Sequence, residues 1–174
     1  MSEFYEGIVT VGHMELVSSG FHALPAQRTV RLVRFGERTF GVYAVLSRSD
    51  RMNEDAINEA ATYLSTTCGN ALAVLYDNRV GLRVSKLFRD GELDCEFGET
   101  DEKWVPLDEN GDPDINYHTL STDELNPDDE YECTQDAISL GLAKLGVAIS
   151  VTTNDLKQAF CYDEGEVVAE RKAQ

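Results

Sequence analysis

Residues 53–69, which read NEDAINEAATYLSTTCG, predict an amphipathic helix. Asn53 is a favourable N-cap, and the two acidic residues after it lie in the first turn, where the helix dipole favours negative charge. Gly69 supplies the residue type that most often ends a helix. The residues spaced for one helical face are apolar or small, so we expect this face to cover a sheet. They are Ile57, Ala60, Ala61, Leu64 and Cys68.

Strand patterns precede this helix. Residues 7–11 have the composition of a short strand, and the polar residues 18–20 predict a turn after it. Residues 28–35 and 38–46 are rich in Val, Phe, Tyr and Thr, and the Gly-Glu pair at 36–37 suits a two-residue turn with Gly in its first position. We therefore predict a β-hairpin before the helix.

A meander of strands follows the helix. Residues 71–76 and 80–88 predict two strands, and Asp90-Gly91 is a strong signal for a two-residue hairpin turn. Residues 92–97 alternate apolar and acidic side chains, which predicts a half-buried strand with an acidic outer face. Its inner face is expected to hold Leu93, Cys95 and Phe97.

The C-terminal part predicts helices and short strands. The Asn-Pro pair at 126–127 predicts the start of a second long helix that ends at Gly146, because Pro is favoured at the first helical position. A strand at 147–152, a short helix capped by Asn154 and a last strand at 166–169 are expected beyond it. The apolar stripe of the long helix would consist of Tyr131, Thr134, Ile138, Leu142 and Leu145.

These elements predict an α+β fold: an antiparallel β-sheet, built from a hairpin and then a meander, with one amphipathic helix across a face and a C-terminal helical and strand segment. We expect residues 1–174 to form a single domain, in which 98–126 is an acidic, loop-rich insertion and 127–174 is the C-terminal segment. A further short strand is expected at 103–107, where Pro106 favours an edge position.

The charge is concentrated in residues 90–136. This stretch contains 18 acidic side chains and one base, Lys103, so its formal charge of −17 equals that of the whole chain. Nucleic acid and anionic membranes are therefore poor partners, since binding to phosphate needs clustered Lys and Arg. A basic protein is the partner type that this distribution favours.

The N-terminus and the cysteines favour a cytoplasmic location. Residues 1–6 are acidic and lack the apolar core of a signal peptide, and no apolar run approaches the roughly 20 residues of a membrane helix. The four cysteines are scattered without a C-x-x-C pair, which favours reduced thiols. We therefore expect no membrane association.

Aromatic side chains are interleaved with the acidic residues of this stretch. Such a surface suits an Arg-rich partner, because arginine stacks on aromatic rings and pairs with carboxylates. Trp104 would serve either as an anchor for the partner or as a core residue beneath the loop. The predicted partner-binding residues are Trp104, Asp108, Glu109, Asp112, Asp114, Asp128, Asp129 and Glu130.

Residues 108–116 also resemble the first part of a calcium-binding loop. Oxygen-bearing side chains occur at alternate positions, but Pro113 replaces the glycine of the sharp turn and Thr119 replaces the final glutamate. The candidate metal ligands are Asp108, Asn110, Asp112 and Asp114. A metal-dependent enzyme that uses Asp112, Asp114 and His118 is a related alternative, and either His13 or His22 could form a catalytic pair with a Cys or an Asp.

The leading hypothesis from the sequence is a small acidic protein-binding module or inhibitor, of the immunity or chaperone type, that presents this face to a basic protein. We assign no catalytic residue and no cofactor, and we favour a non-enzymatic role. A calcium-binding protein or metal-dependent enzyme is one alternative. A structural subunit is another, including a homo-oligomer that pairs the acidic face with the basic segment 24–51, whose formal charge is +4.

Overall fold

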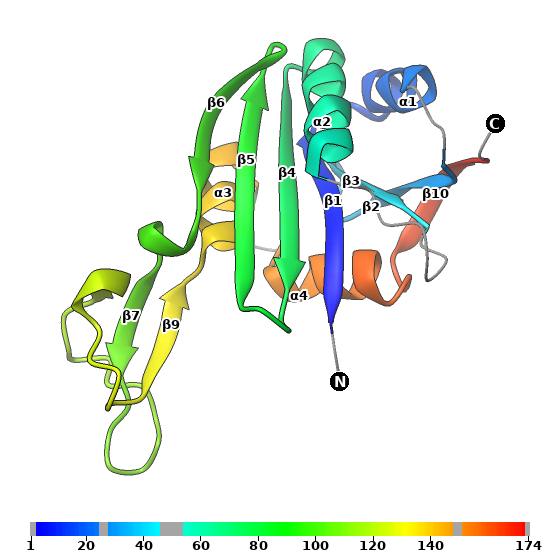
Figure 1. Cartoon of the computed structure of the whole chain (residues 1–174). Helices are drawn as coiled ribbons and strands as arrows, with labels where there is room; N and C mark the ends of the chain where they lie inside the picture. Colours follow the sequence, from blue (N-terminus) through cyan, green and yellow to red (C-terminus); the bar gives the residue numbers. More distant parts are fainter. Residues whose placement is uncertain (1–2, 25–27, 46–53, 148–150, 173–174) are drawn as a thin grey trace.

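The computed structural model describes residues 3–24, 28–45, 54–147 and 151–172. Its main element is a seven-stranded sheet in the order β10-β2-β3-β1-β4-β5-β6, in which all neighbours are antiparallel (Figure 1). This confirms the predicted α+β fold with an antiparallel sheet. The strands are β1 (Phe4–Val11), β2 (Val30–Arg34), β3 (Thr39–Ala44), β4 (Asn70–Asp77), β5 (Leu82–Arg89), β6 (Glu92–Phe97) and β10 (Glu166–Arg171).

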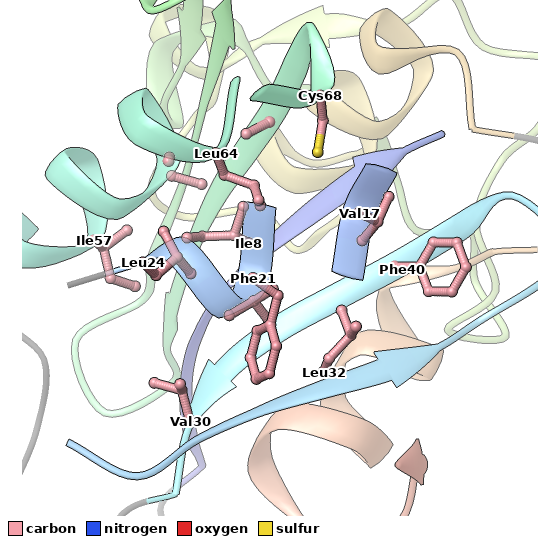
Figure 2. Close-up of a cluster of buried hydrophobic side chains, with 14 of the residues drawn as sticks. Ile8, Val17, Phe21, Leu24, Val30, Leu32, Phe40, Ile57, Leu64 and Cys68 are labelled. Atoms are coloured by element: carbon pink, nitrogen blue, oxygen red, sulfur yellow. The ribbon is translucent and has the colours of Figure 1, made fainter. Parts of the chain in front are cut away.

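The predicted helix α2 (Glu54–Cys68) is confirmed, and its predicted apolar face packs on the sheet. Gly69 follows it with φ +87°, as its position at the end of a helix requires. The predicted cap, Asn53, lies outside the described residues. The face covered by α2 holds one of two hydrophobic clusters, which includes Ile8, Val17, Phe21, Leu24, Val30, Leu32, Phe40, Ile57, Leu64 and Cys68 (Figure 2).

The turn predicted at 18–20 is wrong, because these residues lie within helix α1 (Met14–Ala23). Val17 and Phe21 are buried beside α2, at the spacing of one helical face. Gly20 lies between them, and a Cβ placed there would approach the Leu64 side chain to 2.9 Å. The glycine that suggested a turn instead allows two helices to pack closely. The first face of the sheet is therefore covered by α1 as well as by α2.

The predicted hairpin of β2 and β3 is confirmed, but its two-residue turn is wrong. The register pairs Arg34 with Phe40, and the Phe35 N–H donates to the Thr39 carbonyl at 2.9 Å. An odd number of residues therefore closes the hairpin, and Gly36 does not adopt the positive φ that the predicted turn needs.

The hairpin turn at Asp90-Gly91 is confirmed. Both residues have positive φ, 51° and 85°, and Arg89 pairs directly with Glu92. Leu93 departs from the prediction for β6, because its side chain is 52% exposed. The register shifts between Leu87 and Phe88, and this bulge interrupts the alternation on which the prediction relied.

The long helix predicted to begin at Asn126 is wrong in its first half. Residues 126–129 form a turn, in which the Asn126 side chain accepts from the Asp128 N–H at 3.0 Å. Strand β9 (Tyr131–Gln135) follows, and helix α3 (Ala137–Leu145) begins only after Asp136, whose side chain accepts from the Ser139 N–H. The predicted C-terminal end is confirmed by the left-handed Gly146.

Helices α3 and α4 (Thr153–Leu156) cover the second face of the sheet (Figure 1). The cap of α4 is Thr152, not the predicted Asn154, because the Thr152 hydroxyl accepts from the Asp155 N–H. A π-helical turn, Lys157–Cys161, continues α4. Half of the strand predicted at 147–152, residues 148–150, lies outside the described residues. The predicted last strand is confirmed and extended as β10.

A small three-stranded sheet, ordered β8-β7-β9, lies beyond β6. Strand β7 (Lys103–Pro106) was expected at an edge, but it is central between β8 (Leu120–Ser121) and β9. Pro106 is tolerated there because β8 pairs only with Lys103 and Trp104. The single turn predicted from Ser121 and Glu124 is confirmed as the short helix η2 (Thr122–Glu124) with its capping box.

We call residues 98–135 the acidic lobe. The lobe begins after β6 with the short helix η1 (Glu99–Asp101) and ends with β9, so it includes the expected insertion and the first part of the expected C-terminal segment. Figure 1 shows it projecting beside the main sheet. Among the helices of the described residues, none is long and apolar enough to cross a membrane.

Candidate functional site

The predicted partner-binding residues all lie in the acidic lobe. The lobe contains 13 acidic side chains and one base, Lys103, which gives a formal charge of −12. Of these acids, Glu102 is buried and Asp114 is half-buried, while the others are exposed. The exposed acids include the predicted Asp108, Glu109, Asp112, Asp128, Asp129 and Glu130.

The loop after β7 is held by its own hydrogen bonds. Asp108 Oδ1 accepts from the N–H groups of Asn110 and Asp112 at 2.8 and 3.0 Å, and Asp114 Oδ1 accepts from the Asn116 N–H at 3.1 Å. These carboxylates therefore stabilise turns within the loop. The Pro106 carbonyl closes the base of the loop by accepting from the Asp114 N–H at 2.9 Å.

The candidate metal ligands do not converge. Among the described residues, no group of three or more His, Cys, Asp or Glu side chains is placed to hold a metal ion. His118 stacks on Tyr117, with ring centroids 4.7 Å apart. Within the described part of the chain, no hydrogen bond joins His118 to Asp112 or Asp114.

The two N-terminal histidines have separate positions. His13 precedes α1, and His22 lies in the last turn of α1. The rings of His22 and Phe21 pack edge to face, with their centroids 5.3 Å apart. Within the described residues, no hydrogen bond or ion pair joins either histidine side chain to a Cys or an Asp, so the structure does not form the predicted catalytic pair.

Trp104 belongs to the framework of the lobe. It is half-buried, and its indole N–H donates to the Thr122 hydroxyl at 3.2 Å. That hydroxyl in turn donates to the Glu99 carbonyl at 2.6 Å. The Arg83 guanidinium, which comes from the main sheet, lies 5.8 Å from the centre of the Trp104 ring. Trp104 thus links β7 to η1, η2 and β5, and the second of its two expected roles has the better geometric support.

Two apolar side chains are exposed in the loop that follows β7. Ile115 is 85% exposed and Tyr117 is 43% exposed, and both follow the acidic turn at 108–112. Tyr117 is one of the aromatic residues interleaved with the acids, whereas no sequence pattern predicted that Ile115 would be exposed. Ile115 is an aliphatic residue among polar neighbours, and its exposure depends on how the turn folds.

A buried ion pair fixes the base of the lobe to the body. The Glu102 side chain is 1% exposed and lies 3.0 Å from Arg83 Nε, while Arg83 Nη2 donates to Glu102 Oε1 at 3.1 Å. Glu102 Oε2 also accepts from the Ala137 N–H at the start of α3. Burial raises the pKa of Glu102, and the Ala137 N–H and Arg83 oppose this rise.

One arginine of the hairpin, Arg31, is paired within the body. Arg31 pairs with Asp163 and, through Nε at 2.6 Å, with Glu170. The hydrogen bond from Arg31 lowers the pKa of Asp163. Tyr43 also donates to Asp163, and burial together with this contact raises the pKa of Tyr43 to about 12.

A pocket of about 200 Å³ lies on the second face of the sheet. Its floor is a cross-strand row, because Tyr5 on β1 pairs with Tyr76 on β4, and Tyr76 pairs with Arg83 on β5. The remaining lining residues come from the start of α3 and from α4 with its continuation. They are Asp136, Ile138, Thr153, Asn154 and Lys157.

Comparisons with known proteins identify no relative: no protein-family model, curated protein or solved structure matches this chain.

Proposed function

We propose that the protein is a binding module whose acidic lobe engages a basic protein partner, as an inhibitor or chaperone would. The observation that carries the proposal is that the exposed negative charge is concentrated in a part of the chain that adds little to the hydrophobic core. Exposed carboxylates crowd a lobe that gives the hydrophobic core one fully buried apolar side chain, Val105. A surface of one sign steers an oppositely charged partner toward it.

The exposed apolar residues support a protein partner. Ile115 and Tyr117 lie beside the acidic turn at 108–112, which offers a partner both apolar contact and carboxylates. Interfaces commonly combine such an apolar centre with a charged rim. The hydrogen-bonded loop also reduces the ordering cost of binding, since the turn exists before the partner arrives.

The test compares two variants that lose the same charge. The lobe variant changes exposed carboxylates that form no hydrogen bond or ion pair within the described residues: Glu109→Gln, Asp112→Asn, Asp128→Asn, Asp129→Asn and Glu130→Gln. The body variant changes five equally exposed carboxylates outside the lobe: Glu15→Gln, Glu37→Gln, Glu59→Gln, Glu164→Gln and Glu166→Gln. Both keep the net charge equal, so any difference between them reports location.

The probe is a synthetic arginine-rich peptide that contains leucine, titrated by calorimetry at low and at physiological salt. We expect the lobe variant to bind the peptide about ten-fold more weakly than wild type, and the affinity of the body variant to stay within about two-fold of wild type. Salt screens the interaction between exposed charges that lie far apart, so only carboxylates near the bound peptide contribute much to its affinity. Equal losses in the two variants would show that only total charge matters and would refute the proposal. Ile115→Ser should weaken the leucine-containing peptide more than a leucine-free one.

A further inference from the structure

We infer that the pocket above Tyr5, Tyr76 and Arg83 binds a small zwitterion with one carboxylate and one ammonium group, the chemical class of the free amino acids. The inference concerns a pocket whose lining residues lie outside the acidic lobe. It rests on the volume of the pocket, on the Tyr5 hydroxyl in its lining and on the two signs of charge in its wall.

The pocket is a built cavity in the fold. The Tyr5 and Tyr76 rings, stacked with their centroids 5.0 Å apart, line it on the side of the sheet, and the first turns of α3 and α4 form the walls. Its volume of about 200 Å³ falls below the roughly 300–1,000 Å³ of sites for drug-sized ligands. A ligand of a few heavy atoms therefore suits it.

Tyr5 supplies a hydroxyl-bearing side chain to the lining of this cavity. The side chain is 99% buried, because its relative exposure is 1%, and yet it lines the pocket. Among the described residues, no hydrogen bond to the Tyr5 hydroxyl is found. Burial, with a smaller contribution from the Asp136 charge, raises the pKa of Tyr5, so the hydroxyl stays neutral and can donate or accept. The hydroxyl is therefore available to a ligand in the cavity.

Two cations offer donors to a carboxylate. Glu102 occupies the Nε and Nη2 side of Arg83, and within the described residues no hydrogen bond uses Nη1. Lys157 lies 3.1 Å from Glu3 and 5.4 Å from the centre of the Tyr76 ring, so two further ammonium protons remain.

Asp136 gives the wall a charge of the opposite sign. Its Oδ1 accepts from the Ser139 N–H at 2.7 Å, which leaves Oδ2 for an ammonium group. An anion alone would leave the free oxygen of Asp136 without a donor, and a cation alone would leave the free protons of Arg83 and Lys157 without an acceptor. A ligand that carries both charges satisfies both sides.

The experiment titrates the full chain with the twenty free L-amino acids and follows backbone amide signals by nuclear magnetic resonance. Propionate and ethylamine serve as half-probes, since each lacks one charged group of alanine. We expect at least one amino acid to shift the signals of Tyr5, Tyr76 and Arg83 at millimolar concentration, and both half-probes to bind at least ten-fold more weakly. No shift with any amino acid, or equal binding by propionate, overturns the inference.

Variants then locate the ligand. Asp136→Asn keeps a cap for α3 while removing the charge, and it should weaken binding at least ten-fold. Asp155→Asn makes the same change at the start of α4, outside the pocket lining, and should leave binding unchanged. Tyr5→Phe should weaken binding several-fold. The amide spectrum of Asp136→Asn shows whether this variant is folded. If it is folded and binds the amino acid as tightly as wild type does, the role inferred for Asp136 is wrong.

Discussion

The body of the protein and its acidic lobe are stabilised in different ways. The body buries apolar side chains on both faces of a seven-stranded sheet, in two clusters. The lobe has one fully buried apolar residue, Val105, and relies on turn hydrogen bonds and on the Glu102–Arg83 pair. Burial of apolar area is the dominant favourable term in folding, so the body can fold largely without the lobe's surface. The lobe's surface is correspondingly free to carry charge.

The largest effect should come from the centre of the second cluster. The buried Phe160 ring approaches the ring of Tyr43 to 5.4 Å, and a Cβ at Gly7 or Gly41 would lie 2.8 Å or less from it. Phe160→Ala should lower the free energy of unfolding by about 3–5 kcal/mol, because it leaves a cavity in this packing. Urea unfolding measures the change. A loss below about 1 kcal/mol would contradict the role of this cluster.

The next effect should be local to the lobe. Glu102→Ala leaves Arg83 and the Ala137 N–H without their acceptor, at a cost of about 1–3 kcal/mol. Hydrogen exchange should show lost protection in β7, in β9 and at the start of α3, while β1 and β4 keep theirs. Glu102→Gln retains an acceptor for the Ala137 N–H and should cost less. Uniform loss of protection across both regions would show that the lobe and the body unfold as one unit.

A smaller effect concerns the pH dependence of the body. The Arg31 hydrogen bond lowers the pKa of Asp163, so the charged form stabilises the fold above the ordinary aspartate pKa. This contribution is lost as the pH falls through the lowered pKa, below about 4. Asp163→Asn should remove less than about 1 kcal/mol at neutral pH, because Asp163 is nearly half exposed, and should flatten the stability curve below pH 4. An unchanged acid limb would contradict this assignment.

The smallest effect on stability should come from the lobe variant with five neutralised carboxylates. Exposed side chains without partners change the free energy of unfolding by no more than about 0.5 kcal/mol. Protection of the lobe's amides should rise slightly at low salt, since repulsion among its acids is relieved. Global destabilisation by this variant would mean that the carboxylates take part in folding.

The parts of the fold that depend on neighbouring residues could be predicted from the sequence. Helix α2, the Asp90-Gly91 turn and the Ser121–Glu124 capping box each depend on chemistry within a few residues. Strand β9 could not, because it forms only by pairing with β7, and its residues also fit a helical spacing. The same limit applies to α1, whose Gly20 is explained only by its contact with α2.

The sequence predicted the negative charge of the candidate site, but it did not predict how the side chains of the site are arranged in space. The exposed acids of the lobe follow from composition alone. The framework role of Trp104 depends on Thr122 and Arg83, and the pocket depends on a row of residues from three strands. Register between distant strands is not encoded in any local pattern, so the sequence offered no signal for the pocket.

The central claim is that the acidic lobe binds the basic partner, whereas the buried apolar side chains of the body stabilise the fold. Its most direct test is a nuclear magnetic resonance map of the wild-type chain titrated with the arginine-rich, leucine-containing peptide. We predict that the displaced amide signals belong to residues 98–135, with the largest displacements around Ile115 and the acidic turn at 108–112. Displacements spread over the exposed acids of the body, or confined to the body, would contradict the account.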